Sequence, residues 1–329
     1  MLRTTKKIAL FVILFSVLLI AEGAGQQLPV YSQYMMNKFL INPAIAGSEG
    51  YTAINLTARE QWIGMKDSPK THALSFHTRI LNDSYIHRIT SIRRKSKKSS
   101  RDSKVGLGGY IFNDRNGLVS RTGLRLTYAY HIKLYEGQLS FGLSGSIYQF
   151  KLNLDEMHSF DPGDIVLLNA NSTALIPDAD AGVYYSYPDW YAGLSASSLL
   201  QSRFKFGKQG YENYRLKRHF YLVGGYHFRQ IDNLDIEPNF LIKLSETPRF
   251  QMDLGTKVYF SGNYWGGLAY RTGGALVFMA GVKVEKFYFG YAFDYSLSSL
   301  MRHSFGSHEF MLALILGGDD ARRYRWVNP

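Results

Sequence analysis

The stretch KFYFGYAFDYS, residues 286–296, carries the clearest strand pattern in the chain. Aromatic side chains occupy every second position from Phe287 to Tyr295. The positions between them are polar, small or Tyr: Lys286, Tyr288, Gly290, Ala292 and Asp294. Because successive side chains of a strand point to opposite faces, the pattern predicts a strand with one apolar face and one face turned to a polar or crowded interior.

The same period of two recurs from residue 51 onward, which predicts a chain built almost entirely of strands. In 124–131 and in 139–147 the apolar positions alternate with polar or very small ones. An even number of antiparallel strands is what single-chain bacterial outer-membrane barrels have. The sequence therefore predicts an all-β transmembrane outer-membrane barrel over 51–316. Its fourteen expected strands are 51–62, 70–80, 104–113, 121–133, 138–150, 179–187, 190–198, 217–228, 234–244, 250–261, 263–271, 275–284, 286–296 and 306–316.

The N-terminus has the features of a secretory signal peptide. Its basic start, MLRTTKK, precedes an apolar run over residues 8–20 and small residues up to Gly25. A run of this length is short of the ~20 residues that a membrane-spanning helix needs, so cleavage before Gln26 is predicted rather than an anchor. Export predicts a location in the outer membrane of a Gram-negative bacterium. With no Cys in the chain, disulfides and thiol chemistry are excluded.

Composition agrees with a barrel in a membrane. Aromatic residues make up 15% of the chain, with 24 Tyr and 21 Phe, and there are 31 Gly. Mean hydropathy is only −0.17, as expected where one face of each strand is apolar and the other wet. The net charge of +12 is typical of nucleic-acid binding, but export of the chain makes nucleic acid an unsuitable partner.

The connections between the expected strands sort by length. Every second connection is tight except one, whereas the intervening ones include the long loops 151–178, 199–216 and 297–305. Bacterial barrels have short periplasmic turns and longer external loops, so the long loops are predicted to face outward. The one long connection among the otherwise tight ones is 81–103, and the alternation of connections predicts that it is periplasmic. Its basic residues include Arg93, Arg94, Lys95, Lys97 and Lys98. Such a run is ordinarily solvated; the alternative is a tether for a periplasmic partner or anionic polymer.

Three motifs resemble one family. SQYMMNKFLINPAIAG (32–47), REQWIGMKDSPKTH (59–72) and SHEFML (307–312) are similar to PorP/SprF proteins, outer-membrane components of the type IX secretion system of Bacteroidota. The resemblance implies a fourteen-stranded barrel that serves protein secretion, gliding motility or cell-surface anchoring. It implies as partners a secreted protein with a type IX C-terminal targeting domain, periplasmic ring or lipoprotein subunits, and outer-membrane lipid. Two departures are the long 81–103 segment and a C-terminal periplasmic tail, 317–329.

Residues 26–50, before the first expected strand, are predicted to form a plug-like segment inside the barrel. Asn42-Pro43 marks a turn and Gly47 permits another. Tyr hydroxyls and Asn amides suit a polar lumen. The alternative is a simple lead-in to the first strand. The plug and lumen residues are Gln33, Tyr34, Asn37, Asn42, Pro43 and Gly47.

Two further groups of residues are candidates for contact. If Arg59 faces inward, it can bond to the plug-like segment, and Trp62 would then lie in the outer interfacial girdle. The candidates at the end of the first strand and in the first loop are Arg59, Gln61, Trp62, Gly64 and Pro69. In the loop 151–178, the apolar residues Leu167, Leu168 and Leu175 form either a loop core or a cargo-docking rim.

No enzyme, cofactor or metal site is predicted. The chain has no P-loop and no dinucleotide fingerprint. His308 and Glu309 are neighbours on one strand and so face opposite ways. The expected function is to receive the C-terminal domain of a secreted protein and hold it at the surface. The alternatives are a plugged channel or hydrophobic-solute transporter, and a purely structural partner of the periplasmic ring.

Overall fold

The computed structural model describes residues 30–80, 104–152, 173–206, 212–231, 234–247 and 249–317. The predicted signal peptide, the basic turn 81–103, Leu167 and Leu168, and the tail from residue 318 lie outside these ranges. Within them, no helix is long and apolar enough to cross a bilayer.

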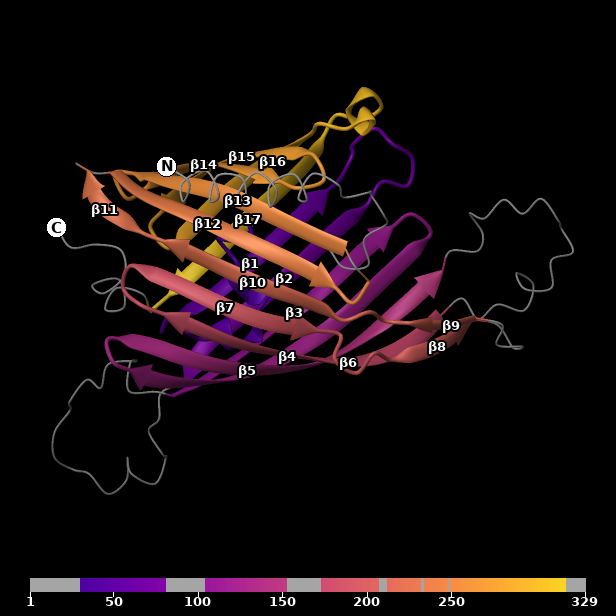
Figure 1. Cartoon of the computed structure of the whole chain (residues 1–329), viewed down its shortest axis with the longest axis horizontal. Helices are drawn as coiled ribbons and strands as arrows, with labels where there is room; N and C mark the ends of the chain where they lie inside the picture. Colours follow the sequence, from indigo (N-terminus) through magenta and orange to yellow (C-terminus); the bar gives the residue numbers. More distant parts are fainter. Residues whose placement is uncertain are drawn as a thin grey trace, which may run out of the picture.

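Fourteen antiparallel strands close into one barrel, as the sequence predicted (Figure 1). Neighbours along the chain pair in order, β1 pairs with β17, and β10 pairs with β12 to close the ring. The strands are β1 (Thr52–Glu60), β2 (Lys70–Ile80), β3 (Val105–Asn116), β4 (Val119–Leu134), β5 (Gly137–Leu152), β6 (Thr173–Ser186), β7 (Trp190–Ser197), β10 (His219–Tyr226), β12 (Leu234–Ser245), β13 (Arg249–Phe260), β14 (Tyr264–Arg271), β15 (Ala275–Val284), β16 (Phe287–Ser296) and β17 (Ser307–Leu316).

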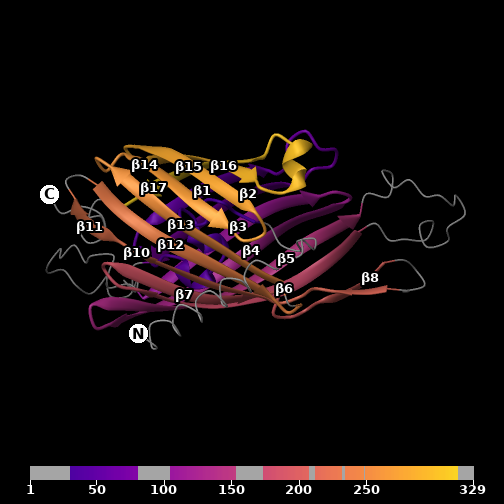
Figure 2. The same cartoon turned by 45° about the horizontal axis from the view of Figure 1, so that its top comes forward.

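Three short elements lie outside the ring. Strand β11 (Phe228–Ile231) follows β10 and pairs with β12, with a register shift between Phe228 and Ile231. Strands β8 (Arg203–Phe206) and β9 (Glu212–Arg215) form a separate hairpin that extends beyond one end of the barrel (Figure 2). We call this the loop end; it also carries 61–69 and the 3-10 turn η5 (Ser299–Arg302). The opposite, turn end carries tight connections such as 135–136 and 285–286.

Alternation along each strand separates two faces. In β16, Phe287, Phe289 and Tyr291 are exposed on the outside, whereas Gly290, Ala292 and Asp294 are buried inside. The exposed large side chains of the other strands likewise lie on their outer faces, as in β4 and β5. A band of exposed apolar side chains around the barrel is the surface that lipid covers.

Two expected loops contain strands. The loop 151–178 is shorter than predicted because β6 begins at Thr173, and the expected loop 199–216 holds β8 and β9. Leu175 is therefore not a loop residue: it pairs with Gln149 and points outward with 67% of its surface exposed. The residues after it, Pro177 and two Asp, resemble a turn in sequence, which hid the strand.

The proline fits this strand for a topological reason. Ala179 accepts a hydrogen bond from Leu199 N, so Ala179 and Pro177, two residues before it, both face the β7 side. The β6–β7 ladder stops at Ala181. At Pro177 there is no β6–β7 ladder, so the missing amide hydrogen of proline breaks no hydrogen bond. This is the situation of a proline at a sheet edge.

The core is formed by residues 30–50, which we call the inner segment. It contains two 3-10 turns, η1 (Lys38–Leu40) and η2 (Pro43–Ile45). Tyr34, Met35 and Phe39 are buried and pack with inward-facing side chains from strands all around the ring, including Tyr110 of β3, Tyr221 of β10 and Trp265 of β14. One hydrophobic cluster thus consists of the inner segment and the wall around it, and a second one, formed by Tyr148, Phe150, Ile176 and Leu216, lies apart from the segment.

Candidate functional site

The inner segment crosses the lumen from one end to the other. Ser32 bonds to Asp294 and Glu309, which lie near the loop end of β16 and β17. Gly47 donates its amide hydrogen to His77 Nδ1 (3.3 Å), close to the turn end of β2. The chain therefore traverses the barrel interior before β1 starts at the turn end.

Polar residues of the first motif fix the segment to opposite walls. Tyr34 Oη donates to Asn239 Oδ1 on β12 (2.7 Å), and Asn37 Nδ2 donates to Ser75 Oγ on β2 (3.0 Å). Gln33 N donates to Glu309 Oε1 (2.8 Å). Asn239 on β12 stands far around the ring from Ser75 on β2 and Glu309 on β17, so the segment is tied across the lumen rather than along one side.

Asn42 does two things at the turn that precedes Pro43. Its Oδ1 accepts the amide hydrogen of Ala44 (2.9 Å) and so caps η2, as short polar side chains do at the start of a helical turn. Its Nδ2 donates to the carbonyl oxygens of Val183 and Leu194 (3.1 and 3.3 Å). Asn42 therefore sets the shape of the turn and also attaches it to β6 and β7.

The wall leaves room for the segment where it carries glycine. A Cβ on Gly142 of β5 would overlap the backbone of Pro43 and Ala44, and a Cβ on Gly106 of β3 would overlap the carbonyl of Ala46. On the segment itself, Gly47 has φ +68°, and a Cβ there would lie 2.6 Å from Thr78 O. Backbone approaches backbone at these points without an intervening side chain.

A charged cluster holds the loop-end part of the inner segment. Arg59 of β1 reaches Asp294 Oδ2 (2.7 Å), Glu309 Oε2 (3.3 Å) and Ser32 Oγ (2.7 Å). Arg271 of β14 reaches Asp294 Oδ2 (2.8 Å) and Asp253 Oδ2 (2.9 Å). The cluster comprises Ser32, Arg59, Asp253, Arg271, Asp294 and Glu309, all buried.

Ser32 is the point where the inner segment enters this cluster. Its hydroxyl donates to Asp294 and accepts from both guanidinium groups, while its amide hydrogen goes to Glu309 Oε2 (2.7 Å). Two guanidinium groups and two carboxylates from four strands therefore converge on one residue of the inner segment, and Asp253 on a fifth strand joins them through Arg271. Buried charges persist only when paired and hydrogen-bonded, so the segment and the wall depend on each other.

A second buried ion pair stands nearer the turn end. Lys257 Nζ of β13 lies 2.9 Å from Glu237 Oε2 of β12, and both side chains are almost wholly inaccessible. Tyr191 Oη donates to Glu237 Oε1 (2.9 Å), and Lys38 of the inner segment lies over the Tyr191 ring, 4.3 Å from its centroid. The lumen is thus crossed by charged contacts at two levels.

At the loop end, two connections join into what we call the outer ridge, residues 61–69 and 297–306. Ile63 and the 305–306 backbone exchange hydrogen bonds (2.7 and 2.9 Å). Gly64, at φ +98°, leaves the space that the Phe305 ring occupies. Phe305 itself is 77% exposed. The two connections are therefore joined by backbone hydrogen bonds, and the ridge exposes an aromatic side chain close to the start of β17.

The remaining residues predicted for the first loop support the ridge. Gln61 is buried and donates its amide hydrogen to Pro69 O (2.8 Å), which closes the base of the loop. Trp62 is partly exposed, has φ +50° and donates its amide hydrogen to Ser307 Oγ (3.2 Å). Arg59 points inward instead and belongs to the charged cluster.

Sequence reasoning missed the partners of Arg59. Asp294 appeared only as an inward position of an aromatic strand, and Glu309 only as part of the SHEFML motif. A signal was available, because an ionisable side chain on the inner face of a membrane strand needs a counter-charge. The sequence contains several such residues, and which of them meet depends on how the barrel closes.

The arrangement does not suggest catalysis. Glu309 faces inward to Ser32, whereas His308 faces outward and shares a hydrogen bond with Tyr291 Oη (2.7 Å). Among the described residues, no group of three or more His, Asp or Glu is placed to hold a metal ion. The structure is a closed barrel with a filled interior and, at the loop end, a rim that includes the hydrogen-bonded outer ridge.

Sequence comparison identifies the family. The family model for the type IX secretion system membrane protein PorP/SprF matches residues 23–314, from before the inner segment to the last strand. The chain belongs to the PorP/SprF family. Membership and the closed barrel together make it an outer-membrane-type component of type IX secretion. No curated protein sequence matches it.

Solved structures with a similar shape are outer-membrane proteins of low sequence identity. The outer membrane protein Omp33 of Acinetobacter baumannii is 6% identical with a TM-score of 0.45, over 80% of this chain and 97% of Omp33. CdiB from the same organism is 7% identical with a TM-score of 0.39, over 80% of this chain and 60% of CdiB. The NanC porin is 8% identical with a TM-score of 0.35, over 80% of this chain and 97% of NanC.

Proposed function

We propose that this PorP/SprF protein is a non-enzymatic receptor in the outer membrane that binds the C-terminal domain of a secreted protein and anchors it at the cell surface. The observation that carries the proposal is the filled lumen. The inner segment and two levels of buried ion pairs occupy the interior, which leaves the rim as the surface available to a partner.

Orientation supports the loop end as the receiving side. Tight turns are typical of the periplasmic end of bacterial barrels and long loops of the external end. On this basis the outer ridge and the β8–β9 hairpin face outward, and the tight turns face periplasmic secretion or gliding components. Leu167 and Leu168 remain proposed docking residues of the external loop, and Leu175 lies beside that loop on β6.

The main alternative, a plugged channel or hydrophobic-solute transporter, requires the inner segment to leave. Its attachment to opposite walls disfavours this, because several buried hydrogen bonds and charged contacts would have to break together. Purified wild-type protein in planar bilayers is therefore expected to show no conductance. Stable open steps through wild-type protein would favour the channel.

Phe305→Ala should weaken cargo retention. Interface energy is concentrated in a few large side chains, aromatic ones in particular, and Phe305 is an exposed aromatic side chain on a hydrogen-bonded part of the ridge. Recovery of a surface protein ending in a type IX targeting domain should fall by roughly tenfold or more, the factor for about 1.4 kcal/mol. The measurement is affinity capture of tagged protein from native outer membranes, quantified by mass spectrometry.

The matched control is Tyr135→Ala, which removes an exposed aromatic side chain from a tight connection at the turn end. It should leave cargo recovery unchanged. Equal losses in both variants would show that the ridge is not the docking surface. If wild-type protein brings down only periplasmic subunits, the proposed anchoring role is wrong.

A further inference from the structure

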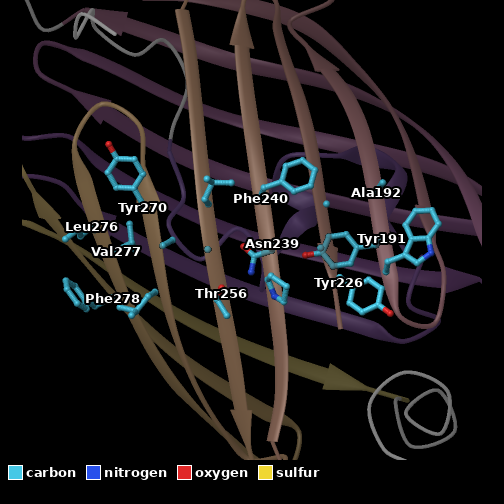
Figure 3. Close-up of a pocket in the computed structure, with 18 residues that line it drawn as sticks. Tyr191, Ala192, Tyr226, Asn239, Phe240, Thr256, Tyr270, Leu276, Val277 and Phe278 are labelled. Carbon is cyan, nitrogen blue, oxygen red and sulfur yellow. The ribbon is translucent and has the colours of Figure 1, made fainter. Parts of the chain in front are cut away.

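A large apolar groove lies on the outer wall of the barrel, away from both the lumen and the rim. It has a volume of about 1000 Å³ and runs across β7, β10, β12, β13, β14 and β15 (Figure 3). That volume is at the upper end of the range of roughly 300–1,000 Å³ for ligand pockets. Nothing in the proposed cargo-binding role uses this surface.

The groove is formed by two neighbouring rows of outward-facing side chains. Its floor consists of small or compact residues, Ala192, Gly224, Pro238 and Thr256. Its walls are large: Trp190 and Tyr226 at one end, Phe240 alongside, and Leu268 with Phe278 at the other end. Because these small residues lie between large ones, the outer surface is hollowed here rather than flat.

The groove covers a point where the β10–β12 ladder is interrupted. His227 N donates to the carbonyl oxygen of Asp189, the residue just before β7. The backbone polar groups of His227 and Gly225 therefore face β7, and those of Tyr226 face β12. Directly opposite Tyr226 on β12 is Pro238, the next position after the Gly225–Asn239 pair. Because proline has no amide hydrogen, the Tyr226 carbonyl does not receive the ladder bond expected there.

The ladder along this seam is interrupted over a short distance. Pairing between β10 and β12 ends at Gly225, resumes in the same register where Phe228 of β11 pairs with Ile236, and shifts register between Phe228 and Ile231. In lipid there is no water to satisfy backbone polar groups, so a defect in a membrane ladder is costly if left open. A close apolar cover over this seam would exclude competing polar molecules and hold the two strands together.

The groove is continuous with the lipid-facing surface, and that identifies its occupant. Leu254, Leu268 and Phe278 belong both to the groove and to the exposed apolar band of the barrel. The described lining contains no charged side chain to attract a polar partner. We propose that the groove is a binding site for an acyl chain of an outer-membrane phospholipid, seated across the β10–β12 seam.

Filling the groove should displace the lipid. Thr256→Phe places a ring on the floor without altering the seam residues, and Ala192→Leu fills the other end. The control Leu143→Phe adds a ring to the outer face of β5, at a residue outside the groove lining that is already 65% exposed. Each full-length protein is reconstituted in phosphatidylethanolamine–phosphatidylglycerol vesicles, re-extracted in mild detergent and weighed by native mass spectrometry. A heat-shift gel confirms that each barrel is folded.

Wild type and Leu143→Phe should each retain one phospholipid molecule. The two groove-filling variants should retain at least about tenfold less, the factor that corresponds to about 1.4 kcal/mol. The proposal is overturned if wild type retains no phospholipid, if the filled groove retains as much as wild type, or if protein from native membranes carries a polypeptide there instead. Because cargo is absent from this assay, its result is independent of the anchoring role.

Discussion

Arg59→Met should abolish stable folding of the barrel or reduce its stability more than any other single change considered. The guanidinium group is 1% exposed and pairs with Asp294 and Glu309. Without it, one guanidinium remains for three carboxylates. Removing one partner of a buried ion pair typically costs about 3–5 kcal/mol, because the other charge is left uncompensated. Stability is measured by urea titration of the protein in lipid vesicles, with the heat-shift gel as readout.

Two further variants test the cause. Lys70→Met breaks the exposed pair of Lys70 with Glu60, so its effect should be only about 0–1 kcal/mol. Adding Glu309→Gln to Arg59→Met removes the carboxylate that loses its guanidinium partner, whereas Asp294 keeps Arg271, and it should restore part of the loss. If Arg59→Met is as stable as Lys70→Met, the charged cluster does not hold the barrel together.

Gly142→Val should expel the inner segment while the wall of the barrel stays intact. A side chain at residue 142 overlaps the backbone of η2, which has no room to move because Asn42 holds it to β6 and β7. Valine is otherwise favourable in a strand. We expect a protease to cleave within residues 30–50 at least about tenfold faster in the variant than in wild type, as a loss of more than about 1.4 kcal/mol would produce.

The same strand provides the control. Gly145 lies on the outer face of β5, and a Cβ there meets no atom within 4 Å. Gly145→Val should therefore leave the inner segment protected. Conductance of the two variants in planar bilayers adds a second readout: only Gly142→Val should show current. Cleavage at the wild-type rate in Gly142→Val would mean that the segment does not depend on this contact.

These two changes address different properties of one assembly. Arg59 concerns the charges that join five strands to Ser32, whereas Gly142 concerns the space in which η2 sits. The cargo interaction at Phe305 should be lost with Arg59→Met, because the ridge grows out of β1 and β17. Its response to Gly142→Val shows whether the receptor surface needs the inner segment.

Most of the fold could be predicted from local pattern. All fourteen barrel strands were expected, within a few residues, because alternation in a membrane barrel is enforced by lipid on one side. The exception is β6, whose start was predicted at residue 179 but lies at Thr173. Pro177 and its neighbouring Asp residues misled the prediction because they are turn residues in most contexts. Only the end of the β6–β7 ladder makes proline acceptable there.

Only part of the candidate site could be predicted from the sequence. The first motif contained the residues that line the inner segment, but nothing in its spacing indicates that Tyr34 meets Asn239 or that Ser32 meets Asp294. These partners are more than 200 residues apart in sequence. Such contacts depend on ring closure, which brings the first strand beside the last.

The number of strands, their inward and outward faces and the family could be read from residues close together in the chain. Three features required the folded barrel: which inward charges are neutralised, which glycines admit the inner segment, and where Pro238 leaves a ladder hydrogen bond unmade. A strand's faces follow from its own period of two, whereas a buried contact depends on the register of every strand around the ring.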